Sequence, residues 1–175
     1  MHIRLALLDD LPAIEALVER ALDELLDEFL SQDEVAASRH IMGVDRQLVA
    51  DGTYFLAFSG DTLAACGGWS HRATLFGGDA TLGRNSRQLD PGVEPARIRA
   101  MYTHPDWTRR GLGRLILSAC ENAAREAGFS QAELAATRAG WPLYAACGYI
   151  ALEDWQESTP NGVGVPLTRM RKTLD

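Results

Sequence analysis

Residues 105–114 of the chain read Pro-Asp-Trp-Thr-Arg-Arg-Gly-Leu-Gly-Arg, and they separate a predicted strand at 97–103 from a predicted helix at 111–127. The N-terminus of a helix carries unpaired N–H groups and the positive end of the helix dipole, so it binds anions. Gly111 and Gly113 remove side chains that would keep a ligand away from the backbone. Fixed positive charge suited to phosphate comes from Arg109, Arg110 and Arg114. The stretch predicts a pyrophosphate-binding loop, and a tight turn with a solvated arginine cluster is the alternative.

A second strand is predicted at 130–136, after Gly128, which ends the helix as a C-cap residue. A strand, a helix and a strand in this order form a βαβ unit, with two parallel strands joined by a right-handed crossover. A dinucleotide-binding unit would need a third glycine at position 116, where the chain has Ile116. The pattern therefore argues against an NAD-dependent oxidoreductase.

Outside this unit, hydrophobic periodicity and turn signals predict both helices and strands. The predicted elements are a strand at 2–8, a helix from Asp10 to about residue 30, a helix opened by a Ser31–Glu34 capping box and running to about Val49, a hairpin of strands at 53–59 and 62–70, a short helix at 140–147, and strands at 149–155 and 164–172. Residues 72–95 predict an extended loop, and a loop of that length is usually functional. Because no repeat or linker is found, we expect one domain over residues 1–175.

Composition argues against several classes of protein. The formal net charge of −7 argues against a nucleic-acid partner, which needs a basic surface. No apolar run approaches the roughly 20 residues that span a bilayer, and the N-terminus shows no signal peptide. The three cysteines form no Cys-x-x-Cys pair, so we expect reduced thiols. We therefore expect a soluble cytoplasmic protein that binds neither nucleic acid nor membranes.

The chemically active residue types narrow the choice further. Lys172 is the single lysine and lies near the end of the chain, so neither a Schiff-base lysine nor the lysine of a phosphate-binding NTPase loop has a candidate. The four histidines are isolated in the sequence, so we expect no metal site.

Three segments together resemble the GNAT superfamily of N-acetyltransferases. They are the strand that ends in Tyr-Thr-His-Pro, the Arg-Arg-Gly-Leu-Gly loop, and the later Leu-Tyr-Ala-Ala-Cys-Gly-Tyr at 143–149. The resemblance is clearest from Ile98 to Tyr149. The superfamily's loop pattern, Gln/Arg-x-x-Gly-x-Gly/Ala, aligns with residues 108–113, and the first position departs from it as Thr108. The resemblance implies an α/β (α+β) fold with a mixed, mostly antiparallel sheet, a central splayed pair of parallel strands, and flanking helices.

The resemblance also implies roles for individual residues. Backbone groups of Met101, Tyr102 and Thr103 would pair with the pantetheine arm and the thioester carbonyl of the cofactor. The pyrophosphate would lie on the backbone of Arg109, Arg110, Gly111, Leu112, Gly113 and Arg114. Thr137 stands where the superfamily often has an asparagine that contacts the cofactor. Tyr144 stands where the superfamily commonly has a general acid, and a tyrosine that only packs under the cofactor is the alternative.

The function that follows is an N-acetyltransferase that moves an acetyl group from acetyl-CoA to an amine by direct attack on the thioester. The amine would belong to a small molecule, a protein N-terminus or a side chain. A cationic amine would suit the net negative charge, but the sequence does not identify the acceptor. Candidates for the general base are His71, Asp79, Glu94 and His104. An acyl-CoA sensor without turnover is the alternative function, and the sequence leaves open whether the chain forms a homodimer.

Overall fold

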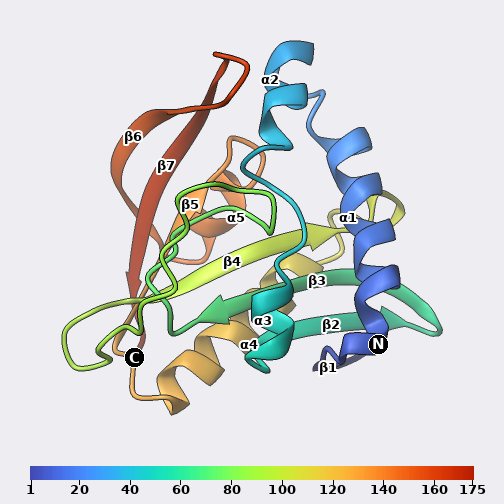
Figure 1. The fold of residues 1–175 in the computed structure, drawn as a ribbon. Helices are drawn as coiled ribbons and strands as arrows, with labels where there is room; N and C mark the ends of the chain where they lie inside the picture. Colours follow the sequence, from blue (N-terminus) through green and yellow to red (C-terminus); the bar gives the residue numbers. More distant parts are fainter.

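One seven-stranded sheet, in the order β1-β2-β3-β4-β5-β7-β6, runs through the computed structural model, which describes residues 1–175 (Figure 1). The strands are β1 (His2–Leu5), β2 (Tyr54–Ser59), β3 (Thr62–Ser70), β4 (Ala96–Thr103), β5 (Gln131–Ala136), β6 (Ile150–Ser158) and β7 (Gly164–Thr173). All neighbouring strands are antiparallel except β4 and β5, which are parallel. This arrangement confirms the predicted mixed, mostly antiparallel sheet with one parallel pair.

The parallel strands β4 and β5 separate soon after they begin. They pair only at Ala96 with Ala132 and at Arg97 with Glu133, although both strands continue beyond these residues. A β-bulge lies nearby, where the register of β3 against β4 shifts and Ala100 adopts a positive φ of 51°. A bulge bends its strand and increases the local twist. The result is a wedge-shaped gap between β4 and β5 in the middle of the sheet.

A buried ion cluster holds the two strands together where the gap begins. Glu133 on β5 is fully buried and is paired with Arg97 of β4 and with Arg169 and Arg171 of β7. Burial by itself raises the pKa of the Glu133 carboxyl, but hydrogen bonds from Arg169 and Arg171 outweigh it and the net shift is downward. The carboxylate therefore stays ionised and joins three strands at the narrow end of the wedge.

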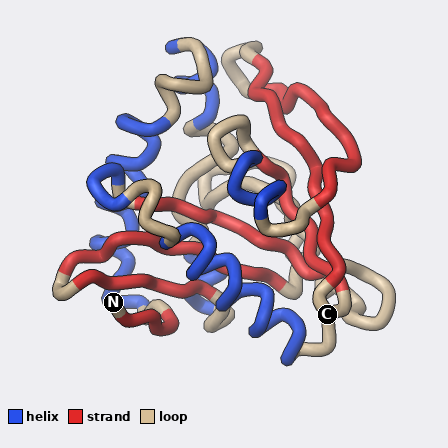
Figure 2. The backbone as a smooth tube through the Cα atoms, turned by 180° about the vertical axis from the view of Figure 1, so that it is seen from behind, coloured by secondary structure: helices blue, strands red, loops and turns tan.

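Helices cover both faces of the sheet. The helices are α1 (Leu11–Leu25), α2 (Gln32–Ser38), α3 (Arg46–Ala50), α4 (Leu112–Glu126) and α5 (Trp141–Ala146), with short 3-10 turns at Leu8–Asp10 and Pro105–Trp107. Helix α4 crosses one face of the sheet over β2, β3 and β4, and α1 packs on β3 and β4 from the other face (Figures 1 and 2). Two apolar cores result, one on each face. None of the helices combines the length and the apolar character needed to cross a bilayer.

The expected helix from Ser31 to Val49 is wrong as a single element. The Ser31–Glu34 capping box forms as predicted, but α2 ends at Ser38 and α3 begins only at Arg46. Gly43 has a φ of 144°, which breaks the helix, and the Asp45 carboxylate caps α3 by accepting from the amide of Gln47.

Two smaller boundaries near the N-terminus also differ from the prediction. The first strand ends at Leu5, and α1 ends at Leu25, earlier than expected. The Asp10 side chain does not cap α1, because it binds the guanidinium of Arg4 and the amide of Leu7 instead. Residues 72–95 are an extended loop as predicted, with one isolated bridge between Arg72 and Gln88.

Candidate active site

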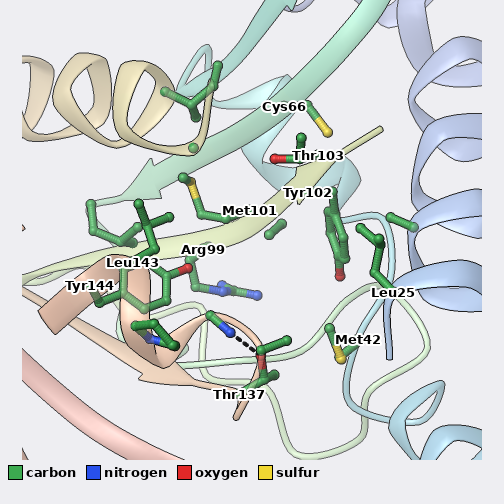
Figure 3. A pocket seen from close by; sticks show the side chains of 18 of the residues that line it. Leu25, Met42, Cys66, Arg99, Met101, Tyr102, Thr103, Thr137, Leu143 and Tyr144 are labelled. Atoms are coloured by element: carbon green, nitrogen blue, oxygen red, sulfur yellow. Dashed lines mark hydrogen bonds between the residues drawn. The ribbon is translucent and has the colours of Figure 1, made fainter. Parts of the chain in front are cut away.

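A cavity of about 770 Å³ occupies the gap between β4 and β5. It is bounded by the N-terminal end of α4, by α5, by the C-terminal part of α1, and by residues 75–77 of the long loop. Figure 3 shows Met101, Tyr102 and Thr103 of β4 along one side and Tyr144 of α5 across from them. The structure therefore brings the predicted strand, loop and tyrosine to one place.

The loop before α4 presents backbone amides to this cavity. Arg109 and Gly111 both have left-handed backbone conformations, with φ of 61° and 81°. The first helical hydrogen bond of α4 runs from the amide of Leu115 to the carbonyl of Gly111 at 3.0 Å. The amides of residues 112–114 therefore lie before that bond and are not used by the helix, which suits them to an anion.

The arginines of this loop divide into two groups. Arg109 and Arg114 line the cavity, and their positive charge adds to that of the helix terminus. Arg110 does not line it, because its guanidinium lies over the Trp107 ring, 4.6 Å from the centroid. The expected contribution of Arg110 is thus confined to its backbone.

Gly113 lines the cavity and also has a packing role that the sequence did not suggest. A Cβ atom at this position would lie 2.8 Å from a methyl carbon of Leu143 on α5. The missing side chain therefore allows α4 and α5 to pack closely, whereas an added Cβ at Gly111 would meet nothing within 4 Å. At Gly111 the requirement for glycine comes from the positive φ.

The edge of β4 that faces the gap is open to a ligand. Beyond Arg97 the strand has no paired residue on β5, so Met101, Tyr102 and Thr103 lie where the two strands have separated. The Tyr102 ring is buried and its hydroxyl accepts a hydrogen bond from the amide of Gly43 at 2.8 Å. An extended chain can pair with such an unpaired strand edge.

Tyr144 lines the cavity from α5 and is buried. Its ring meets the Tyr149 ring edge-on, with centroids 5.9 Å apart. Its hydroxyl makes no hydrogen bond to the other residues drawn in Figure 3. Burial raises the pKa of the Tyr144 phenol above its ordinary value, so the group keeps its proton and can donate it to a hydrogen-bond acceptor.

Thr137 also lines the cavity, at the turn between β5 and α5. Its hydroxyl accepts a hydrogen bond from the amide of Gly140 at 3.2 Å, the dashed line in Figure 3. Backbone bonds from Gly140 and Trp141 to the Thr137 carbonyl complete this turn. Thr137 thus sets the start of α5 and, through it, the place of Tyr144.

The four candidates for the general base lie outside the cavity. None of them is a lining residue. Asp79 pairs with Arg46 and Arg84, and Glu94 pairs with Arg87, which by hydrogen bonding lowers the pKa of that carboxyl to about 2. His71 bonds to Gln88, and His104 lies beside Arg20. Their positions do not support the expectation that one of them takes a proton in the cleft.

Arg99 was not among the site residues predicted from the sequence. This side chain is almost fully buried, lines the cavity, and points from β4 into the space framed by Tyr144, Thr137 and Met42 (Figure 3). A signal was present, because Arg97 and Arg99 stand two positions apart on a strand that is otherwise apolar, and so share one face. No group of three or more His, Cys, Asp or Glu side chains is arranged to hold a metal ion.

Comparison with known proteins identifies the family of the chain. The sequence matches the model of the acetyltransferase (GNAT) family over residues 16–149. No curated protein matches the chain.

Several solved structures share the fold. A GCN5-related N-acetyltransferase from Rhodopseudomonas palustris has a TM-score of 0.71 at 20% identity, with 99% of this chain and 95% of that chain covered. A ribosomal-protein-alanine N-acetyltransferase from Brucella melitensis has a TM-score of 0.68 at 18% identity, with 99% and 100% covered. The yncA structure from Salmonella typhimurium, with its cofactor acetyl-CoA, has a TM-score of 0.66 at 18% identity, with 99% and 94% covered. Because the family model spans most of the sequence and the fold agrees, the chain belongs to the acetyltransferase (GNAT) family, whose members transfer an acetyl group from acetyl-CoA.

Proposed function

We propose that the chain is an enzyme that transfers the acetyl group of acetyl-CoA to a primary amine, and that the amine attacks the thioester directly. One observation carries the proposal. The gap between β4 and β5 is one cavity that is lined both by the N-terminal end of α4 and by Tyr144. A long ligand with a charged end and a reactive end fits such a cavity.

The lining residues suit acetyl-CoA in order along the cavity. The amides of residues 109–114, with Arg109 and Arg114, would hold the pyrophosphate. The open edge of β4 at Met101, Tyr102 and Thr103 would pair with the amides of the pantetheine arm. The thioester would then lie beside Tyr144, where the two strands are apart.

In the transfer, the amine nitrogen forms a bond to the thioester carbonyl carbon and the bond from that carbon to sulfur breaks. The nitrogen loses one proton to water, and the departing thiolate gains one. Tyr144 donates a hydrogen bond to the sulfur as negative charge develops there. An ordinary phenol has a pKa of about 10, and an ordinary thiol has one of about 8.5. Full proton transfer from the phenol to the thiolate is therefore unfavourable by about 2 kcal/mol. Burial raises the pKa of Tyr144 further, so we expect hydrogen bonding to the sulfur and final protonation from water.

No carboxylate or histidine lines the cavity, so the amine has to lose its proton without a base in direct contact. Burying an ammonium group lowers its pKa, and this favours the neutral, nucleophilic form. The same lack of a base is the one observation that favours the alternative, an acyl-CoA-binding sensor without turnover.

Binding and turnover experiments test the proposal in sequence. Acetyl-CoA at about 100 times its Kd should stabilise the protein against heat by about 2.7 kcal/mol, and NAD should not. Thiol release is then measured over a panel of primary amines. Stabilisation by NAD alone would contradict the proposed cofactor, and binding of acetyl-CoA without thiol release from any amine would support the sensor.

A further inference from the structure

The end of the cavity away from α4 is apolar. Its walls come from the C-terminal end of α1 and the turn after it, the segment before α3, the long loop and β7. The side chains concerned are those of Leu25, Phe29, Met42, Leu75, Phe76 and Leu167. Such walls favour an acceptor with an apolar body, because burying apolar surface is worth about 25 cal/mol per Å².

The charged side chains that line the cavity are all positive. They are Arg99, Arg109 and Arg114, and no Asp, Glu or His is among the lining residues. Arg109 and Arg114 belong to the α4 end, so Arg99 is the charge nearest the apolar end. A second ammonium group on the acceptor would therefore be buried beside a guanidinium with no carboxylate to pair with it.

Arg99 retains the capacity to bind an anion. It lies 2.8 Å from Asp45, but Arg84 also lies 2.8 Å from the same carboxylate. Asp45 is thus shared between two guanidinium groups, and Arg84 also reaches Asp79, at 3.6 Å. Arg99 also donates to the carbonyls of Gly77 and Thr74, at 2.5 and 3.4 Å.

These contacts involve the two Nη atoms of Arg99 and leave its other N–H donors for a ligand. Burial lowers the pKa of Arg99 to about 10, so the group remains charged at neutral pH.

We propose that the acetyl acceptor is an apolar amino acid or a close analogue, whose side chain lies against the apolar walls and whose carboxylate pairs with Arg99. This inference rests on the proposed transferase function. It differs from the cationic acceptor, such as a polyamine, that the net charge alone would suit. The reason is that the net charge of −7 belongs to the chain as a whole, whereas the charged side chains that line the cavity are all positive.

A matched pair of amines tests the role of the carboxylate. L-Phenylalanine and phenethylamine share the ring and the amine and differ in the carboxylate, and spermidine represents polycations. We expect kcat/KM for L-phenylalanine to exceed that for phenethylamine by about 10–100-fold, the range expected for a charge-assisted hydrogen bond. Spermidine should react more slowly than both.

Variants then assign the preference to Arg99. Arg99→Gln should lower the ratio of the two kcat/KM values by about 10-fold or more, mainly through KM, and Arg99→Lys should restore part of it. Arg97→Lys is the matched control, because Arg97 lies on the same strand and face but does not line the cavity. A purely structural role for Arg99 would lower both rates alike and leave their ratio unchanged, which would overturn the proposal.

The remaining outcomes separate this inference from the transferase function. Preference for spermidine would overturn the substrate class while leaving the transferase intact. If acetyl-CoA binds but no amine reacts, calorimetry with N-acetyl-L-phenylalanine decides. If the wild-type protein binds this compound and Arg99→Gln does not, the proposed class of ligand is upheld even though the protein is not an enzyme. If the wild-type protein does not bind it, the proposed class of ligand is rejected.

Discussion

Tyr144 and Arg99 reach the same cavity from opposite sides of the gap, one neutral and one charged. Burial raises the pKa of the phenol and lowers that of the guanidinium, so at neutral pH Tyr144 keeps its proton and Arg99 its charge. Tyr144 is therefore suited to a developing negative charge on sulfur, and Arg99 to a charge already present on the acceptor. The two residues divide the proposed work between chemistry and recognition.

Tyr144→Phe should lower turnover by about 10²-fold or somewhat less while leaving acetyl-CoA affinity unchanged. General acid catalysis is typically worth about 10²–10⁴-fold, and a thiolate is already a fair leaving group, so the low end is expected. The ring remains in phenylalanine, so packing is largely kept. The measurement is single-turnover thiol release together with calorimetry of acetyl-CoA binding.

Tyr149→Phe is the control for this variant. The Tyr149 ring contacts that of Tyr144, but the residue does not line the cavity. Removing the Tyr149 hydroxyl should therefore leave turnover unchanged. Equal turnover in wild type and Tyr144→Phe, under conditions where chemistry limits the rate, would show that Tyr144 only packs.

Among the helices and strands, α4 is the element whose N-terminal end we propose to bind the pyrophosphate of the cofactor. Both of its ends are glycines with positive φ, 81° at Gly111 and 95° at Gly128. An alanine would have enough space at either position, since its Cβ would meet nothing within 4 Å at Gly111 and only Pro91, at 3.7 Å, at Gly128. The two glycines differ in their position relative to the cavity, because Gly111 lines it and Gly128 does not.

Gly111→Ala and Gly128→Ala should each destabilise the fold by about 1 kcal/mol, through the left-handed backbone that alanine resists. Only Gly111→Ala should also weaken coenzyme A binding, by about 10-fold, because the amides of the loop would lose their alignment. Chemical denaturation and calorimetry measure the two effects. Equal loss of affinity in both variants would mean that the pyrophosphate does not lie at this end of α4.

The β4–loop–α4–β5 segment could be predicted from the sequence because its signals are local. Glycines at both ends of α4, arginines in the loop and the apolar strands all lie within residues 96–136. The split between α2 and α3 was missed although its signals, the break at Gly43 and the Asp45 cap two residues before Gln47, are also local. The packing of Gly113 on Leu143 joins positions 30 residues apart in the printed numbering, and that of Arg99 on Asp45 joins positions still farther apart. Such pairs follow from the fold and not from local pattern.

Across the whole molecule, the tyrosines are divided between the two cores. Tyr54 and Tyr102 lie in the core beneath α1, and Tyr144 and Tyr149 lie in the core beneath α4. All four tyrosines of the chain are buried, and burial raises the pKa of every one above its ordinary value. Because both cores are built on one sheet, we expect the loss of either to unfold the other.

The protein should therefore lose stability steeply above about pH 10, in one cooperative step. Tyrosines in the unfolded chain ionise near pH 10, whereas the folded state holds their protons to higher pH. Above that pH the folded state binds more protons than the unfolded state, so rising pH favours unfolding, by up to about 5 kcal/mol per pH unit for four groups.

Tyrosinate absorbance and circular dichroism, followed together from pH 8 to 12, should change at the same pH. Tyr144→Phe should reduce the tyrosinate signal by one group in four, and a chain in denaturant should titrate near pH 10 without a step. Tyrosinate absorbance that rises near pH 10 while the circular dichroism stays native would show that the tyrosines are open to solvent, Tyr144 included.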